Sequence, residues 1–122
     1  MKERYNDPEI VITENGFAVD GEDDLPLEAA LNDTRRVEYI TSHVNELLKA
    51  ISLDGVRVKG YFVWSLMDCL EWMEGYRTRF GIHRVDFNDP NRPRTPKRSA
   101  EVYKEIIRNN GFPRTLQEKI EL

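Results

Sequence analysis

Two apolar stretches, each followed by a helical pattern, limit what this chain can fold into. Residues 9–13 read EIVIT, and residues 56–64 read VRVKGYFVW, which is continuously apolar from Tyr61 to Trp64. Such runs are typical of strands that are buried on both faces in a parallel sheet. Strands that alternate with helices imply parallel pairing with right-handed crossovers. The sequence therefore predicts an α/β fold in which both strands end at the same edge of one sheet.

The segment between the two strands has the periodicity of an amphipathic helix. From about Asp33 to Ile51, apolar residues recur at steps of three and four, which places them in one stripe. Asn32 or Asp33 is positioned to cap the start of this helix, and Gly55 follows its end.

A last helix is predicted to begin at Thr95-Pro96, with threonine as the N-cap and proline at the first helical position. The residues at 109–111, Asn-Asn-Gly, are predicted to end it. Its buried face is expected to consist of four residues, Ala100, Tyr103, Ile106 and Ile107.

The connecting segments have weaker signals. Residues 19–26 are acidic and contain glycine, so we expect a surface loop there. Residues 79–87 could form a short extra strand, and residues 88–94 have the composition of a turn-rich loop. Residues 113–122 carry no clear signal and are left as an unassigned tail.

Two strand–helix units do not make a complete sheet. A two-stranded parallel sheet leaves pairing groups and apolar surface exposed on its faces and edges. We therefore expect residues 1–122 to be part of one larger domain, or to need a partner.

Composition excludes several classes of function. The chain has 122 residues, of which 39% are hydrophobic and 33% charged, as in a globular protein. A net charge of −4 with interspersed signs gives no attraction for nucleic acid or an anionic membrane. No apolar run approaches the roughly 20 residues of a membrane-spanning helix. The polar start MKERYNDPE lacks the pattern of a signal peptide. The compartment stays open, with a secreted location slightly favoured over a cytoplasmic one.

Metal and thiol chemistry are also disfavoured. A single cysteine, Cys69, allows neither an internal disulfide nor a cysteine-rich metal site. The two histidines, His43 and His83, are too few for a histidine metal cluster. Cys69 has no obvious base beside it, so it is not expected to be a nucleophile. We expect neither a metal nor a cofactor.

Carboxylates and tryptophans gather where the two strands end. Glu14 follows the first strand directly, and Glu71 follows the second after a short loop. In parallel sheets, functional groups are found at the carboxyl ends of the strands. Trp64 and Trp72 accompany the two glutamates. Because indole rings stack on sugar rings and carboxylates accept hydrogen bonds from hydroxyls, the pattern indicates a carbohydrate site.

Simpler interpretations remain open for each of these residues. Glu14-Asn15-Gly16 could be only a turn in which the Asn-Gly pair supplies the positive φ. Glu71 could be a solvated loop carboxylate, and Trp64 could belong to the core. His83 is more readily explained as a structural or exposed histidine than as a base.

The motifs nevertheless resemble those of one family, the family 1 glycoside hydrolases, or β-glucosidase family. ITENG at residues 12–16 resembles the nucleophile signature of that family. GYFVWSLMDCLEWMEGYRTRFGIHRVDF at residues 60–87 resembles its C-terminal signature, although Cys69 and Leu70 stand where Asn and Phe are usual. The resemblance runs from about Tyr5 to Phe112, and the sequences NRPRTPK and NNGFP look most like animal members.

The resemblance implies a fold and a role for each candidate residue. The family folds as a (β/α)₈ barrel, so the chain would be its C-terminal portion, with strands seven and eight at residues 9–13 and 58–64. Glu14 would be the catalytic nucleophile, mounted at the tip of a rigid strand. The substrate-binding residues would be Trp64 under the sugar ring, Glu71 on two of its hydroxyls, Trp72 through its indole N–H, and Phe80 in the wall.

The implied activity is hydrolysis of β-glucosides with retention of configuration. The family's acid/base glutamate lies in a T-x-N-E-P motif, and no such motif occurs in this sequence. The chain alone is therefore expected to be inactive. Its expected partners are a β-glycoside substrate and either the rest of a barrel or a second copy. A non-catalytic sugar-binding member of the family, a small module that folds by itself, and thioglucoside specificity remain alternatives.

Overall fold

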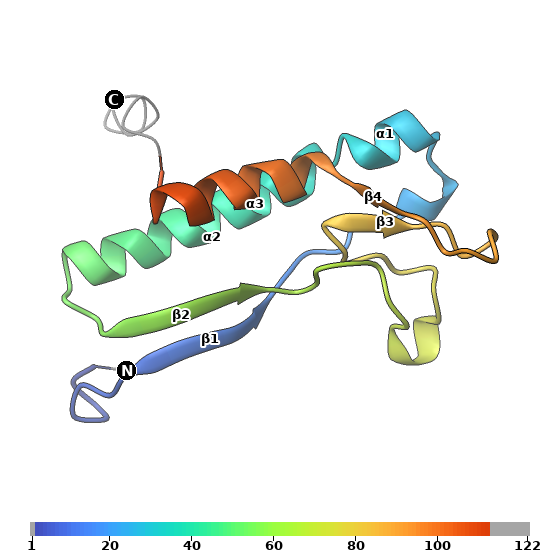
Figure 1. The fold of residues 1–122 in the computed structure, drawn as a ribbon. Coiled ribbons are helices and arrows are strands. Elements are labelled where there is room, and N and C mark those ends of the chain that lie inside the picture. The colour runs from blue at the N-terminus through green and yellow to red at the C-terminus, as the bar shows by residue number, and fades with distance from the viewer. Residues whose placement is uncertain (1, 113–122) are drawn as a thin grey trace.

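The computed structural model describes residues 2–112, so the unassigned tail lies outside the described residues. Strands β1 (Ile10–Asn15) and β2 (Val58–Val63) pair in parallel, as predicted. The register pairs Ile10 with Val58 and Asn15 with Val63, with irregularities between. Both strands therefore end at the same edge of the sheet (Figure 1).

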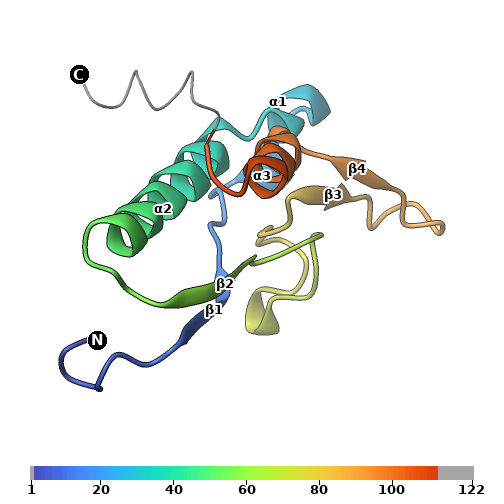
Figure 2. The ribbon, with the colours of Figure 1, turned by 60° about the vertical axis from the view of Figure 1, so that its left-hand side comes forward.

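Two long helices cover one face of this sheet. Helix α2 (Thr34–Ser52) connects β1 to β2, and α3 (Arg98–Asn109) lies beside α2 on the same side of the strands (Figures 1 and 2). The core between them is small and consists of Ile40, Val44, Ile82, Ala100 and Ile106, with Tyr61 and Val63 of β2 packed against it.

The other face of the sheet is open, which corrects the expectation of strands buried on both faces. Val11 is 50% exposed and Phe62 is 59% exposed. Both side chains lie against Gly60 of β2, and within residues 2–112 no further layer shields them from solvent. The exposed surface is the one expected of an incomplete parallel sheet.

The predicted start of the last helix is wrong. Thr95 and Pro96 belong to a short strand, β4 (Arg94–Pro96), which pairs antiparallel with β3 (His83–Val85). The helix begins at Arg98, with Lys97 at the N-cap position. Proline is tolerated on a two-stranded ribbon because its missing N–H can face outward. β3 confirms the short strand expected within residues 79–87, and β4 takes Arg94 from the predicted loop.

The buried face and end of α3 are mostly as predicted. Ala100 and Ile106 are buried, but Ile107 is 62% exposed, so its assignment to the buried face is wrong. Asn110 has a left-handed conformation at the C-cap, and Gly111 follows it. This is a common way for a helix to end.

The acidic segment predicted as a surface loop is partly buried. It contains a 3-10 helix, η1 (Glu22–Asp24), and the Glu22 side chain is almost fully enclosed. A short helix that we did not predict, α1 (Leu27–Leu31), follows it. Within the described part of the chain, no helix is long and apolar enough to cross a membrane.

Candidate active site

Glu14 is the next-to-last residue of β1 rather than the residue after it. Its side chain is exposed at the edge where both strands end. Asn15, which follows, is held from two sides. Its side-chain amide donates to the Tyr39 hydroxyl at 3.2 Å, and its side-chain oxygen accepts from the Tyr61 hydroxyl at 2.8 Å. Glu14 is therefore mounted on a well-fixed strand end.

Gly16 is needed because the backbone of β2 passes close to it. A Cβ atom at Gly16 would lie 1.7 Å from the carbonyl oxygen of Trp64. Gly16 does not have a positive φ, so the interpretation of this glycine as a left-handed turn residue is wrong. The Trp64 N–H donates to the Asn15 carbonyl at 2.8 Å, which continues the strand pairing. The chain after Glu14 is thus packed directly against the base of the next loop.

Trp64 and Glu71 are brought together by the loop that follows β2. The Trp64 indole N–H donates to Glu71 Oε1 at 3.3 Å, and the Cys69 thiol donates to the same oxygen at 3.3 Å. Burial and the hydrogen bond to Glu71 raise the pKa of Cys69, so the thiol keeps its proton. Trp64 is 38% exposed, so its ring is not a fully enclosed core residue.

Trp72 and Phe80 lie on the same loop but are placed differently. Trp72 begins the 3-10 helix η2 (Trp72–Glu74) and is 92% exposed. Phe80 is half-buried, and its carbonyl accepts from the Ser65 N–H at 3.2 Å, next to Trp64. The Trp64–Ser65 peptide bond is cis. The structure thus joins Trp64, Glu71 and the backbone of Phe80, whereas Trp72 projects outward.

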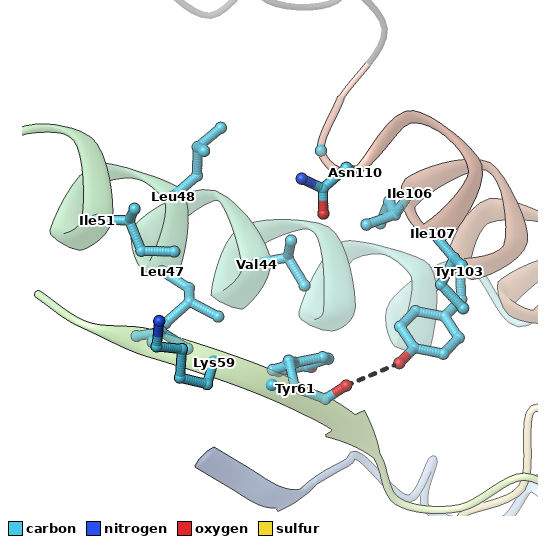
Figure 3. Close-up of a pocket in the computed structure, with 13 residues that line it drawn as sticks. Val44, Leu47, Leu48, Ile51, Lys59, Tyr61, Tyr103, Ile106, Ile107 and Asn110 are labelled. Carbon is cyan, nitrogen blue, oxygen red and sulfur yellow. Dashed lines mark hydrogen bonds between the residues drawn. The ribbon is translucent and has the colours of Figure 1, made fainter. Parts of the chain in front are cut away.

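A separate apolar crevice of about 290 Å³ lies between α2, β2 and α3 (Figure 3). The Tyr103 hydroxyl donates to the Tyr61 carbonyl at 3.2 Å across one end of it. Lys59 is the charged residue among those that line it. With a wall of aliphatic side chains and no carboxylate in its lining, this crevice does not suit hydrolytic chemistry.

Residues 2–112 contain no group of three or more metal-ligating side chains that could hold an ion. The two histidines are engaged otherwise. His43 stacks on Tyr39 with ring centroids 3.9 Å apart, and His83 Nδ1 lies 2.9 Å from the Leu66 carbonyl.

The feature that sequence reasoning missed is a buried charge cluster. Arg36 binds Glu22, donates to Asp33 Oδ2 at 2.6 Å, and reaches the Phe17 and Arg79 carbonyls at 2.9 and 2.8 Å. The cluster consists of three cations and three anions, all buried: Arg36, Arg79, Lys97, Glu22, Asp33 and Asp68.

The cluster changes the pKa values of its cations. Burial lowers the pKa of Lys97, and the nearby charge of Arg36 adds to this, against the attraction of Asp68 and Glu22. Burial is also the largest single effect on Arg36 and acts to lower its pKa, but the hydrogen bonds and negative charges of Glu22 and Asp33 together outweigh it, so the pKa of Arg36 is raised. The cluster ties η1, the start of α2, the loop after β2 and the start of α3 together.

Comparison with known proteins identifies the family. The sequence profile described as "Glycosyl hydrolase family 1" matches residues 1–112. The chain belongs to glycosyl hydrolase family 1. Human cytosolic β-glucosidase is 51% identical over 112 residues, which cover 92% of this chain and 23% of that protein. Human lactase/phlorizin hydrolase is 49% identical over 113 residues, which cover 93% of this chain and 6% of that protein.

Solved structures of this family have the same fold. A double mutant of the Trichoderma harzianum β-glucosidase matches with a TM-score of 0.85 and 46% identity, over 92% of this chain and 24% of that one. A rice β-glucosidase mutant, in a covalent complex with glucose, matches with a TM-score of 0.79 and 43% identity, over 84% of this chain and 21% of that one.

The chain therefore spans about a quarter of the length of these β-glucosidases. Its fold is the one that the sequence predicted, a C-terminal portion of a (β/α)₈ barrel, comprising about strands seven and eight with their helices. The open face of the β1–β2 sheet is the face without helices, which in such a barrel points inward.

Proposed function

We propose that this chain provides the nucleophile and part of the sugar-binding subsite of a retaining β-glucosidase. The observation that carries the proposal is the position of Glu14. It is exposed at the carboxyl end of β1, next to the loop in which Trp64 and Glu71 meet. That edge is where (β/α)₈ barrels carry their catalytic residues. The sequence identities with β-glucosidases support the substrate class.

In the proposed reaction, a Glu14 carboxylate oxygen attacks the anomeric carbon of the glucoside. The bond to the leaving oxygen breaks, and a second carboxylic acid protonates that oxygen. Water then attacks the anomeric carbon of the resulting glycosyl ester and gives its proton to the second carboxylate. The bond from this carbon to Glu14 breaks, which restores the Glu14 carboxylate and releases glucose with its configuration retained. The two carboxyl groups must lie about 5–5.5 Å apart for this mechanism. The rice relative, in covalent complex with glucose, is consistent with such an ester.

The remaining candidate residues would hold the sugar. Glu71 would accept hydrogen bonds from the 4- and 6-hydroxyls of the sugar. Its Oε2 atom is available for this, because Trp64 and Cys69 contact only Oε1 among the described residues. The Trp64 ring would stack under the apolar face of the sugar. Trp72 would donate from its indole N–H once the sugar is bound, and Phe80 would complete the wall.

The acid/base residue has to come from elsewhere, because no T-x-N-E-P motif occurs in the 122 residues. We therefore infer that residues 1–122 are part of one barrel domain. Their partner is the remainder of that barrel, in the same chain or as a separate piece, and the chain is inactive without it.

A hybrid enzyme tests the proposed function. It consists of human cytosolic β-glucosidase in which the matching 112-residue segment is replaced by this chain. We expect the hybrid to hydrolyse a chromogenic aryl β-glucoside and the isolated chain to be inactive. A folded hybrid without activity would overturn the proposal. Activity of the isolated chain would instead contradict the need for the rest of the barrel.

Glu71→Ala in the hybrid is expected to lower kcat and raise KM, with a loss of about a hundredfold in kcat/KM. The reason is that hydrogen bonds to hydroxyls remote from the reacting bond strengthen in the transition state. Steady-state kinetics on the aryl β-glucoside measure both constants. Glu74→Ala, an exposed carboxylate on the same loop, is the matched control and should change neither. A rise in KM at constant kcat would mean that Glu71 binds ground state and transition state equally.

A further inference from the structure

One buried carboxylate, that of Asp68, fixes the stem of the loop that follows β2. Its side chain is 0% exposed and both oxygens are used. Oδ1 accepts from the Gly81 N–H at 3.0 Å and from Lys97 Nζ at 3.2 Å. Oδ2 accepts from Arg79 Nη1 at 2.8 Å and from the Val85 N–H at 3.2 Å. Four donors on one carboxylate, two of them cationic, make a strong anchor.

The two ends of the loop are held together around this anchor. The His83 N–H donates to the Leu66 carbonyl at 3.1 Å, and the Asp68 N–H donates to the His83 carbonyl at 3.0 Å. A Cβ atom at Gly81 would lie 2.1 Å from the Asp68 nitrogen, so the two strands of the stem touch. The stem is therefore rigid where Asp68 lies.

The sugar-binding candidates lie a few residues beyond the stem. Cys69 follows Asp68 directly, and its thiol donates to Glu71. The Glu71 N–H donates to the Gly75 carbonyl at 2.7 Å, which closes the tip of the loop. These tip contacts are local, and the other contact of the Glu71 side chain among the described residues is the Trp64 indole N–H at the end of β2. The placement of Glu71 relative to the barrel therefore depends on the stem as well as on Trp64.

We propose that Asp68 is a positioning residue that holds Glu71 and Trp72 in place for the sugar, an inference that rests on the proposed function of those two residues. Asp68 does not itself touch the sugar, because its oxygens are buried and occupied. It acts through the stem, with Arg79 and Lys97 as its charged partners. An amide at this position would present an N–H to one of these cationic donors and release the stem.

Cys69 provides a readout that needs no catalysis, because it is the single cysteine of the chain. Its reaction rate with Ellman's reagent depends on burial, on its contact with Glu71 and, to a smaller extent, on the charge of Asp68, all of which raise its pKa. The rates are therefore measured over a range of pH and compared per thiolate, so that a change in accessibility is separated from a change in pKa. We expect Asp68→Asn to speed this reaction about tenfold, as the loop opens locally. In the hybrid enzyme, Asp68→Asn should lower kcat/KM on the aryl β-glucoside in the same way as Glu71→Ala.

The matched control is Asp33→Asn. Asp33 belongs to the same buried charge cluster and accepts from Arg36 and Ser99, but it has no contact with the loop after β2 among the described residues. Urea unfolding of both variants gives the global stability for comparison. When the two variants have lost a similar free energy of unfolding, Asp33→Asn should still leave the Cys69 rate and kcat/KM nearly unchanged. Equal effects of the two variants would show that Asp68 serves only stability, and would overturn the proposal.

One further variant and one further measurement keep the test decisive. If Asp68→Asn does not fold, Arg79→Lys takes its place, because it keeps the positive charge but loses the guanidinium contacts with Asp68. An unchanged Cys69 rate in Arg79→Lys would also overturn the proposal. If the isolated chain has no cooperative unfolding transition, the same rates are measured in the hybrid, with its remaining cysteines replaced. The two hypotheses can fail separately. If the hybrid is inactive but Asp68→Asn, and not Asp33→Asn, raises the Cys69 rate, then Asp68 does anchor the loop and it is the proposed function that fails.

Discussion

Replacing Glu14 by glutamine in the hybrid enzyme is expected to reduce kcat by about a thousandfold or more, with little change in the free energy of unfolding. An amide cannot attack the anomeric carbon to form a glycosyl ester, so the first step of the proposed reaction would be lost. Stability should change little, because the Glu14 side chain is exposed. Hydrolysis of the aryl β-glucoside and urea unfolding measure the two quantities on the same samples.

Glu9→Gln is the matched control for this substitution. Glu9 directly precedes β1, at the end opposite to Glu14, and forms surface ion pairs with Arg57 and Lys59 at 2.7 and 3.5 Å. The same loss of charge there should leave kcat within about twofold, because exposed ion pairs contribute little. Near-normal turnover of Glu14→Gln would refute the assignment of the nucleophile, and a similar loss in both variants would point to a general effect of charge.

The main elements of the fold were predictable because the sequence pattern and the structure depend on the same interactions. β1, α2 and β2 have strong apolar periodicity over their whole length, and the structure confirms all three within one or two residues. Their order then determines the parallel pairing. The exposure of Val11 and Phe62 was not predictable from periodicity, because a pattern reports which faces are apolar and not whether anything covers them.

The start of α3 was mispredicted because a local signal lost to a tertiary one. Thr95-Pro96 is a good helix start in isolation. In the structure, the Lys97 N–H donates to the Ile82 carbonyl at 2.9 Å, and its ammonium group binds Glu22 and Asp68. These contacts come from segments 15 or more residues away. Because these contacts fix the backbone and side chain of Lys97, the helix begins after it, at Arg98.

The residues of the candidate site were predicted from residue type and position. The buried residues that support them were not predicted. Glu14, Trp64 and Glu71 stand out because they follow apolar strands. Asp68 and Arg79 stand in loops, where charged residues are usually solvated, so nothing marks them as buried. Even within the resemblance to the family, the sequence did not indicate that Asp68 anchors the loop that carries Glu71. This role is seen only from the hydrogen bonds of the Asp68 carboxylate in the structure.

The buried charge cluster should make Arg36 one of the charged positions at which a substitution costs the most stability. Arg36 is 0% exposed and donates to Glu22, Asp33 and two carbonyls. Arg36→Met keeps most of the side-chain volume but removes the guanidinium that Glu22 and Asp33 share, so that, among the side chains described, Glu22 keeps Lys97 and Asp33 keeps Ser99. We expect the free energy of unfolding to fall by about 3–5 kcal/mol, which is a large part of the stability of a small domain. Urea unfolding of the chain, or of the hybrid enzyme, measures the loss.

Arg35→Met separates this effect from a general loss of positive charge on α2. Arg35 is the neighbouring residue, is exposed, and contacts only the Phe17 ring from 5.6 Å among the interactions described for it. Its replacement should cost about 1 kcal/mol or less. If Arg36→Met cost no more than Arg35→Met, the desolvation of the cluster would offset its attraction, as happens when apolar side chains replace a buried ion pair. The cluster would then determine how η1, α2, α3 and the loop after β2 are arranged, without adding to the free energy of folding.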